Sequence, residues 1–241
     1  MVILRRIMQP WPDSANTLAA DAACAVLHFK PLDDGETTVS VRYTEFGDGS
    51  SELEDEIPVT VPAYNPFTDV PEGSFYHDPV LWAVKKGITT GNTATTFDPN
   101  GQCMRAVVVT FLWRAAGSPE PTITENPFTD VKESDFFYKA VLWALENEIT
   151  NGVSATEFGP FVLCNRAQVV TFLWRAQGKP ATTATESGFS DVTAADAFYY
   201  NAVLWAVENG VTNGISATEF GVNVTCNRAQ VVTFLYRTQA K

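Results

Sequence analysis

The sequence predicts a mainly α-helical protein in which a small β segment precedes three tandem repeats of two helices each. Three observations support this fold class. Apolar and polar residues alternate within residues 29–61. Two motifs recur at spacings of 61 to 62 residues, namely Phe-(Thr/Ser)-Asp-Val at Phe67, Phe128 and Phe189, and Arg-Ala at Arg105, Arg166 and Arg228. A period this regular marks units that bury their apolar faces against one another.

The first predicted element is a β-hairpin in residues 29–61. Its alternating residues are Thr37, Val39, Val41 and Tyr43 before a Gly-Asp-Gly turn at Gly47–Gly49, and Ile57, Val59 and Val61 after it. The order Phe-x-Pro, Thr-Val-x-Val-x-Tyr and Ile-Pro-Val-Thr-Val resembles the last strands of a bacterial immunoglobulin-like domain. Residues 1–28 are too short to complete such a sandwich, so we expect only part of one.

The first helix of each repeat is predicted at residues 75–86, 136–147 and 198–209. Its Val-Leu-Trp-Ala centre is apolar nearly all round, which is typical of a buried helix. A glycine-bearing turn ends it. The aromatic residues just before it, which begin at Phe75, Phe136 and Phe198, are expected to be partly exposed, whereas the Trp residues of both helices are expected in the core.

The second helix of each repeat is recognised by its ends, because Val-Val-Thr-Phe-Leu-Trp alone would also suit a strand. Asn165 and Gln168 form a variant of the capping box, in which each side chain bonds the backbone of the other. Arg175 falls in the last turn and Gly178 ends the helix. Repeat 1 has Met104 in place of the capping Asn, so we expect Arg105 to be held less firmly than its two equivalents.

Composition narrows the classes of partner. The chain has 241 residues, 45% of them apolar, and a net charge of −12. Residues 31–63 carry nine acidic side chains against the single base Arg42, so neither nucleic acid nor an anionic membrane is an expected partner. No apolar run reaches the length of about 18 residues that a membrane span needs.

The N-terminus and the cysteines add little to the prediction of function. Met1 to Met8 contains no apolar stretch typical of a signal peptide before Pro10. A secreted protein would need one, so for an extracellular chain we expect either a truncated N-terminus or a start codon assigned too late. Three of the four cysteines occupy equivalent repeat positions, and Cys24 lies outside the repeats. No CxxC or His-rich spacing indicates zinc, so we expect Cys103, Cys164 and Cys226 to be small buried side chains.

The repeated features together resemble the S-layer homology domain in tandem triplicate. They are Phe-x-Asp-Val, an aromatic pair, Ala-Val-x-Trp, Gly-Ile/Val-Thr-x-Gly, and Arg-Ala before an apolar helix. The resemblance covers about residues 64–241 and gives the domains 1–63, 64–119, 125–180 and 187–241. It implies a three-fold pseudo-symmetric bundle with one helix of each repeat at the centre. It also implies an extracellular module that anchors a bacterial surface protein to cell-wall polysaccharide, often one with pyruvylated sugars.

The candidate binding residues follow from the repeat positions. Arg at a helix start opposes the helix dipole by about 0.3–1 kcal/mol, so its presence in all three copies suggests an anionic partner. That partner is either a glycan carboxylate, held with free N–H groups of the helix start, or the Asp of the opening motif. The resemblance implies a site made of Arg105, Arg166, Arg228, Asp69, Asp130, Asp191, Gly91, Gly152 and Gly214, the glycines letting a sugar approach the backbone.

One feature of the sequence departs from the family pattern, and others argue against an enzyme. The usual Thr-Arg-Ala-Glu of the family has no Glu in any copy here, which leaves the ligand open. His28 and His77 are isolated, and no nucleophile triad, phosphate loop or metal-ligand spacing recurs, so we expect no catalytic residue, no metal and no cofactor. The alternatives are the C-terminal anchor of a secreted enzyme such as a glycoside hydrolase, or a protein–protein module of a surface lattice.

Overall fold

The computed structural model describes residues 65–239 in full and, before them, the backbone of five strands. The chain divides into two compact units, Met1–Asn65 and Pro66–Lys241. In the first unit, β4 (Gly35–Thr44) and β5 (Glu52–Val61) pair antiparallel with Val39 opposite Ile57, so the residues of the predicted alternation lie in one hairpin. β1 (Val2–Ile3) joins the outer edge of β4, and β2 (Met8–Pro10) pairs with β3 (Phe29–Pro31).

Several predictions concern residues outside those that the structure describes. They are the turn at Gly47–Gly49, the environment of Cys24, and the imidazole of His28. The relation to an immunoglobulin-like domain also stays a prediction, because the side chains of the strands are not described.

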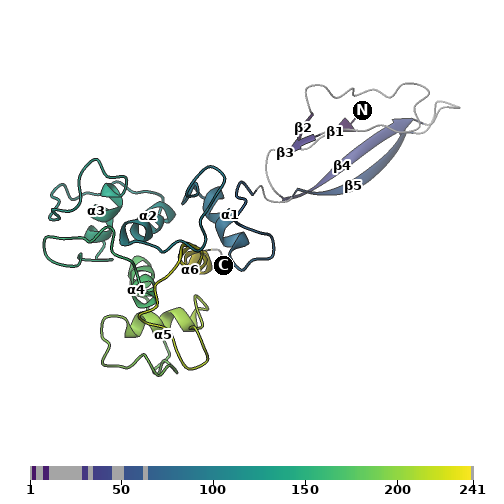
Figure 1. Ribbon diagram of the computed structural model, residues 1–241. Helices are drawn as coiled ribbons and strands as arrows, with labels where there is room; N and C mark the ends of the chain where they lie inside the picture. The colour runs from purple at the N-terminus through teal and green to yellow at the C-terminus, as the bar shows by residue number, and fades with distance from the viewer. Residues whose placement is uncertain are drawn as a thin grey trace. The chain divides into compact units, whose positions relative to one another are not determined.

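The second unit is built from six helices, two in each repeat (Figure 1). The first helices are α1 (His77–Lys85), α3 (Tyr138–Glu146) and α5 (Tyr200–Glu208). The second helices are α2 (Arg105–Ala115), α4 (Arg166–Ala176) and α6 (Arg228–Gln239). The mainly helical, three-fold pseudo-symmetric fold is therefore confirmed, and each first helix begins two residues later than predicted.

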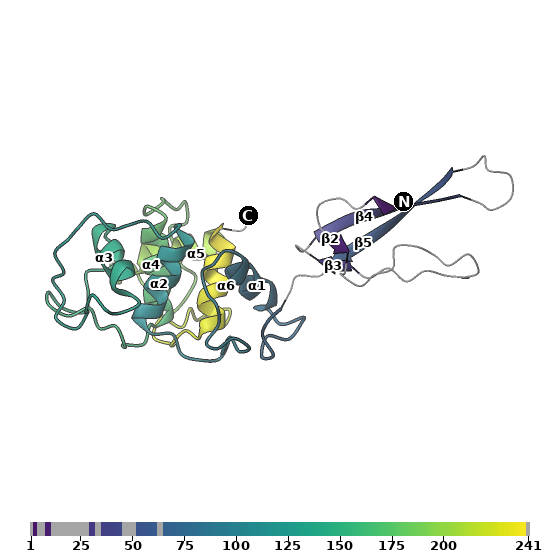
Figure 2. The same cartoon turned by 90° about the horizontal axis from the view of Figure 1, so that it is seen from above.

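The second helices form the centre of this unit. α2, α4 and α6 contact one another, and Figure 2 shows them side by side with α1 and α3 to the outside. Their apolar faces are buried, as are the middle residues of α3 and α5, because Val-Leu-Trp-Ala is apolar on every side. The expected core positions of Trp143 and Trp205 are confirmed, whereas Trp82, Trp113 and Trp174 are only partly buried and pack against the core.

Each first helix packs against the second helix of another repeat. α3 lies on α2, α5 lies on α4, and α1 lies on α6, so the first helix of the chain packs on the last one. The tightest helix pairs thus join consecutive repeats, and the third repeat closes onto the first.

A ring of backbone hydrogen bonds links the repeats just before the second helices. The N–H of Cys164 donates to the carbonyl of Cys103, that of Cys226 to Cys164, and that of Cys103 to Cys226, each over 3.0 Å. The three side chains are fully buried free thiols, as the sequence predicted. Burial raises the pKa of the Cys164 and Cys226 thiols to about 12, so they stay neutral and act as small apolar groups.

Candidate functional site

The arginine at the start of each second helix reaches into the following repeat. Arg105 donates from Nε to the carbonyl of Phe158 over 3.0 Å and from Nη2 to Oγ1 of Thr150 over 2.9 Å. Arg166 makes the equivalent bonds to Phe220 and Thr212 over 2.9 and 2.7 Å. Each guanidinium therefore lies at the junction between two repeats.

Arg228, the third of these arginines, reaches from repeat 3 into repeat 1. Its Nε donates to the carbonyl of Phe97 over 2.9 Å, and no bond to Thr89 accompanies it. Arg228 is half-buried, whereas Arg105 and Arg166 are each only 3% exposed. The prediction that Arg105 would be the least firmly held is therefore wrong, and Arg228 has the fewest bonds.

The reason lies at the start of α2. Met104 makes no side-chain cap, but the N–H groups of Arg105 and Ala106 donate to the carbonyls of Val162 and Pro160 over 2.9 and 3.0 Å. The N–H of Val107, whose equivalent in α4 is bonded by the side chain of Asn165, donates instead to the carbonyl of Met104 over 3.0 Å, so the start of α2 is bonded without a side-chain cap. The first two N–H groups of α4 and of α6 likewise donate to carbonyls of the neighbouring repeat. The N–H groups expected to be free for a ligand are therefore already bonded within the protein.

Each guanidinium is also enclosed by aromatic rings. The Cζ of Arg105 lies 4.9 Å from the ring centre of Phe158 and 5.3 Å from that of Phe172. Equivalent pairs of rings enclose Arg166 and Arg228. Burial lowers the pKa of all three, but an arginine side chain remains protonated at neutral pH.

The opening aspartates anchor the loop that holds the arginine. Oδ1 and Oδ2 of Asp130 each accept a backbone N–H over 2.8 Å, from Phe158 and Gly159. Asp69 accepts the equivalent bonds, and Asp191 accepts a third from Val222. Within residues 65–239 no ion pair joins an opening Asp to one of the three arginines, so Asp positions Arg only through the peptide whose carbonyl the guanidinium bonds.

The turn glycines have a structural reason of their own. Gly152 has a φ of +88°, which favours glycine, and an added Cβ would lie 2.5 Å from the carbonyl oxygen of Glu157 and 2.7 Å from the ring of Phe128. Gly91 and Gly214 are in the same situation. The space that the missing side chain leaves is therefore filled by the protein itself, although Gly152 still forms part of a groove wall.

A groove of about 470 Å³ opens beside Arg105. Arg105 comes from repeat 1 and Phe198 from repeat 3, while the remaining walls belong to repeat 2. The ring of Phe198 is about half exposed and lies 5.1 Å from the Cζ of Arg175. The lining residues are Arg105, Thr150, Asn151, Gly152, Val153, Gln168, Phe172, Arg175 and Phe198.

Sequence reasoning found some of these residues and missed others. The expected exposure of Phe75, Phe136 and Phe198 is confirmed, but Phe137, which belongs to the same aromatic groups, is only 3% exposed. Asn151 was not recognised, and Gln168 and Arg175 were interpreted only as helix-end residues. Gln168 does complete the capping box with Asn165, and it lines the groove as well. The signal that could have identified Asn151 is its recurrence as Asn213 in repeat 3.

The three junctions are named 1–2, 2–3 and 3–1, after the repeat that supplies the arginine and the repeat that the arginine enters. They do not all have the same amide side chains. At the positions of Asn151 and Gln168, repeat 3 has Asn213 and Gln230, whereas repeat 1 has Thr90 and Val107. The junction entered by Arg228 therefore lacks both amide side chains and has the less buried arginine. Junctions 1–2 and 2–3 are alike, and junction 3–1 differs.

Nothing in the described part of the chain forms a site for metal chemistry. No group of three His, Cys, Asp or Glu side chains within it has a metal-binding arrangement. His77 pairs only with the neighbouring Asp78, over 2.8 Å. Among the helices that the structure describes, none is both long and apolar enough to cross a bilayer.

Comparison with known proteins places the three repeats in a described family. The family model of the S-layer homology domain matches residues 66–106, 127–170 and 188–232. The Surface-layer 125 kDa protein of Lysinibacillus sphaericus is 33% identical over 104 residues, which cover 43% of this chain and 9% of that protein.

Two further relatives match a larger share of the chain. A "Cell surface protein" of Thermoanaerobacter kivui is 29% identical over 136 residues, 55% of this chain and 18% of that protein. An "Endoglucanase" of Bacillus sp. (strain KSM-635) is 28% identical over 123 residues, 51% of this chain and 13% of that enzyme. The matched stretch thus spans less than a fifth of each of these relatives.

Proposed function

Because this chain belongs to the S-layer homology domain family, whose model matches more than half of it, we propose that it anchors a bacterial surface protein to the cell wall. The anchoring is non-covalent and extracellular, and the ligand is an anionic wall polysaccharide. The relatives include a surface-layer protein and a cell surface protein, which supports a role at the cell surface.

The observation that carries this proposal is a buried cation without a counter-ion. Arg105 and Arg166 are nearly fully buried, and no carboxylate of residues 65–239 pairs with either. Their bonds engage Nε and Nη2, so Nη1 donates to no described atom. A buried charge is costly unless it is paired, and an anionic group in the groove would pair it.

The walls of the groove suit a sugar that carries a carboxylate. A guanidinium binds carboxylate oxygens in a planar arrangement, while the amides of Asn151 and Gln168 suit hydroxyl or acetamido groups. The exposed ring of Phe198 offers an apolar face at the end of the groove. A pyruvyl or uronic carboxylate is the group that this site would take.

The three junctions should contribute unequally. Junctions 1–2 and 2–3 have the buried arginine with two bonds and both amides, whereas junction 3–1 has Thr90 and Val107 and a half-buried Arg228. The first two are therefore the stronger sites, and the opening aspartates and turn glycines act by holding the loop around each arginine.

The test measures binding to purified cell-wall polysaccharide of Lysinibacillus sphaericus, the host of one relative. Arg105→Ala and Arg166→Ala should each weaken their junction by roughly 2–5 kcal/mol, the loss expected for a buried charge-assisted contact. Arg228→Ala should have the smallest effect. Lys139→Ala, at an exposed cation outside the groove, is the matched control. Unchanged binding of a folded Arg105→Ala/Arg166→Ala double variant would contradict the proposal.

A second candidate is that the chain forms the anchoring part of a secreted enzyme. The match to an endoglucanase over 13% of its length supports it, because a module of this size could be attached to a catalytic domain. We expect no catalysis from the repeats themselves. Reading the genomic DNA around this sequence distinguishes the two, since a continuing frame that encodes a hydrolase would favour the enzyme.

A further inference from the structure

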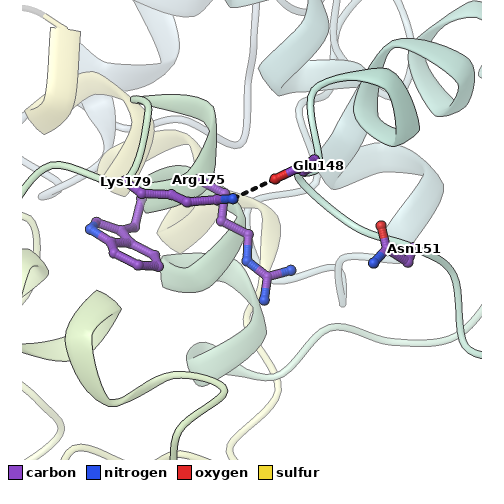
Figure 3. A pocket seen from close by; sticks show the side chains of 5 residues that line it. Glu148, Asn151, Arg175 and Lys179 are labelled. Carbon is purple, nitrogen blue, oxygen red and sulfur yellow. Dashed lines mark hydrogen bonds and ion pairs between the residues drawn. The ribbon is translucent and has the colours of Figure 1, made fainter.

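A second pocket of about 410 Å³ adjoins the groove at junction 1–2 (Figure 3). Glu148, Asn151, Trp174, Arg175 and Lys179 line it. Asn151 and Arg175 line both cavities, so the groove and this pocket share a wall. A polysaccharide that occupies the groove beside Arg105 would have its next sugar within reach of the pocket.

The carboxylate in this pocket is specific to repeat 2. Glu148 occupies the position that is Gly87 in repeat 1 and Gly210 in repeat 3. All three have a left-handed backbone, with φ values of +54°, +70° and +65°. Glycine adopts this conformation freely, whereas glutamate does so rarely.

The stability gained from the ion pair of Glu148 does not explain why a glutamate occupies this position. Nζ of Lys179 lies 2.6 Å from Oε2 of Glu148, and Figure 3 shows the two side chains meeting at the edge of the pocket. The side chain of Glu148 is 74% exposed and that of Lys179 is 44% exposed, and exposed ion pairs of this kind add little stability. Lys179 is itself left-handed, with a φ of +58°. Ser118 has the same left-handed backbone at this position of repeat 1, so the unusual choice is Glu148 in place of glycine. A disfavoured backbone that yields only one exposed ion pair suggests a function instead.

The chemistry of the pocket favours hydroxyl groups. Glu148 offers acceptors, Lys179 and Arg175 offer donors, and Asn151 offers both. The indole N–H of the half-buried Trp174 is already bonded to the carbonyl of Pro180 over 2.9 Å, so what remains for a ligand is its ring. Glu148 pairs with Lys179, and Nη1 of Arg175 is bonded to the carbonyl of Ile149 over 3.2 Å, so both cations are already engaged. The carboxylate of Glu148 would also repel a second carboxylate, which therefore would be held less well here than a neutral sugar.

We propose that the pocket formed by Glu148, Asn151, Trp174, Arg175 and Lys179 is an accessory subsite for a neutral, hydroxyl-rich sugar. This inference rests on the proposed function, because it requires the adjacent anionic sugar to occupy the groove beside Arg105. Junction 1–2 then recognises a longer stretch of polysaccharide than the other two junctions do.

The test exchanges the ion pair for the residues of repeat 1, in the variant Glu148→Gly/Lys179→Ser. Gly87 and Ser118 already tolerate these backbone conformations, so the variant should fold as well as the unsubstituted protein. The matched control is Glu120→Gly/Lys139→Ser, which removes another exposed ion pair, at 2.9 Å, that lines neither cavity. The probes are short and longer oligosaccharides prepared from the wall polysaccharide of Lysinibacillus sphaericus.

The expected result is a loss confined to the longer probes. Their affinity should fall roughly tenfold in Glu148→Gly/Lys179→Ser, as expected when charge-assisted hydrogen bonds are lost, while short probes bind unchanged. Equal affinity of the variant and the control for the longer probes would overturn the subsite. If the unsubstituted protein binds no probe, or the folded Arg105→Ala/Arg166→Ala double variant binds all probes as well as the unsubstituted protein does, the proposed function itself fails.

Discussion

Single carboxylates hold the loops that position the arginines, and Asp191 is the clearest case. Burial alone would raise its pKa, but the hydrogen bonds from the backbone of Phe220, Val222 and Gly221 outweigh burial and hold the pKa below its ordinary value of 3.8. The ionised form is thus stabilised by folding. This stabilisation is fully present above the ordinary pKa and is lost as the pH falls through the lower pKa of the folded protein.

We therefore expect Asp191→Asn to lower the free energy of unfolding by about 1–3 kcal/mol at neutral pH, because a neutral amide replaces a charged acceptor. The difference from the unsubstituted protein should shrink in acid, below both pKa values. Urea unfolding at the two pH values measures it, with Glu133→Gln, at an exposed position, as the control. A difference that grows in acid would contradict this role.

The three repeat thiols offer a second test at the scale of the residue. Burial raises the pKa of all three, and to about 12 for Cys164 and Cys226. In a Cys24→Ser background we expect no reaction with a thiol reagent in the folded state, and three equivalents after denaturation. Labelling of the folded protein at the rate of the denatured chain would show that the ring around the cysteines opens.

At the scale of the helix, α2 differs from the other two second helices because its start has no side-chain cap. α4 has the full capping box, and Asn227 and Gln230 make the same two bonds at α6. Met104→Asn should give α2 the missing acceptor and raise the free energy of unfolding by about 1 kcal/mol. Thermal unfolding measures it, and Asn165→Met, which removes the acceptor from α4, should show the opposite sign. A lower midpoint for Met104→Asn would mean that its contacts outweigh the cap.

The ends of the helices were predictable, but their partners were not. Asn165, Gln168 and Gly178 act within one or two turns, so the sequence pattern predicts where α4 begins and ends. The packing of α3 on α2 and the reach of Arg105 to Phe158 join residues far apart in the sequence, and no local signal encodes them. For the same reason the sequence pointed to the arginine as a candidate binding residue but not to its junction with the next repeat.

At the scale of the whole molecule, the repeats depend on one another. α1 packs on α6, and Arg166 donates to Phe220 and Thr212 of repeat 3. We expect a chain that ends before repeat 3, at residue 186, to lose cooperative unfolding, because α1, α4 and Arg166 would all lack their partners. Circular dichroism during heating measures this.

The matched control is a chain of residues 66–241, which retains every contact of the helical unit. It should keep the single transition of the complete chain. A cooperative transition in the chain that ends at residue 186 would contradict the interdependence of the repeats.

The packing of α1 on α6 also limits how further repeats can be added to the helical unit. In an open array of repeats the last unit leaves a surface on which a further unit can be added. Here that surface on α6 is occupied by α1, and the backbone ring through Cys103, Cys164 and Cys226 has no vacant donor or acceptor for a fourth member. Duplication of a single repeat in the gene would therefore break the closure, so a longer anchor would have to arise by copying all three repeats together.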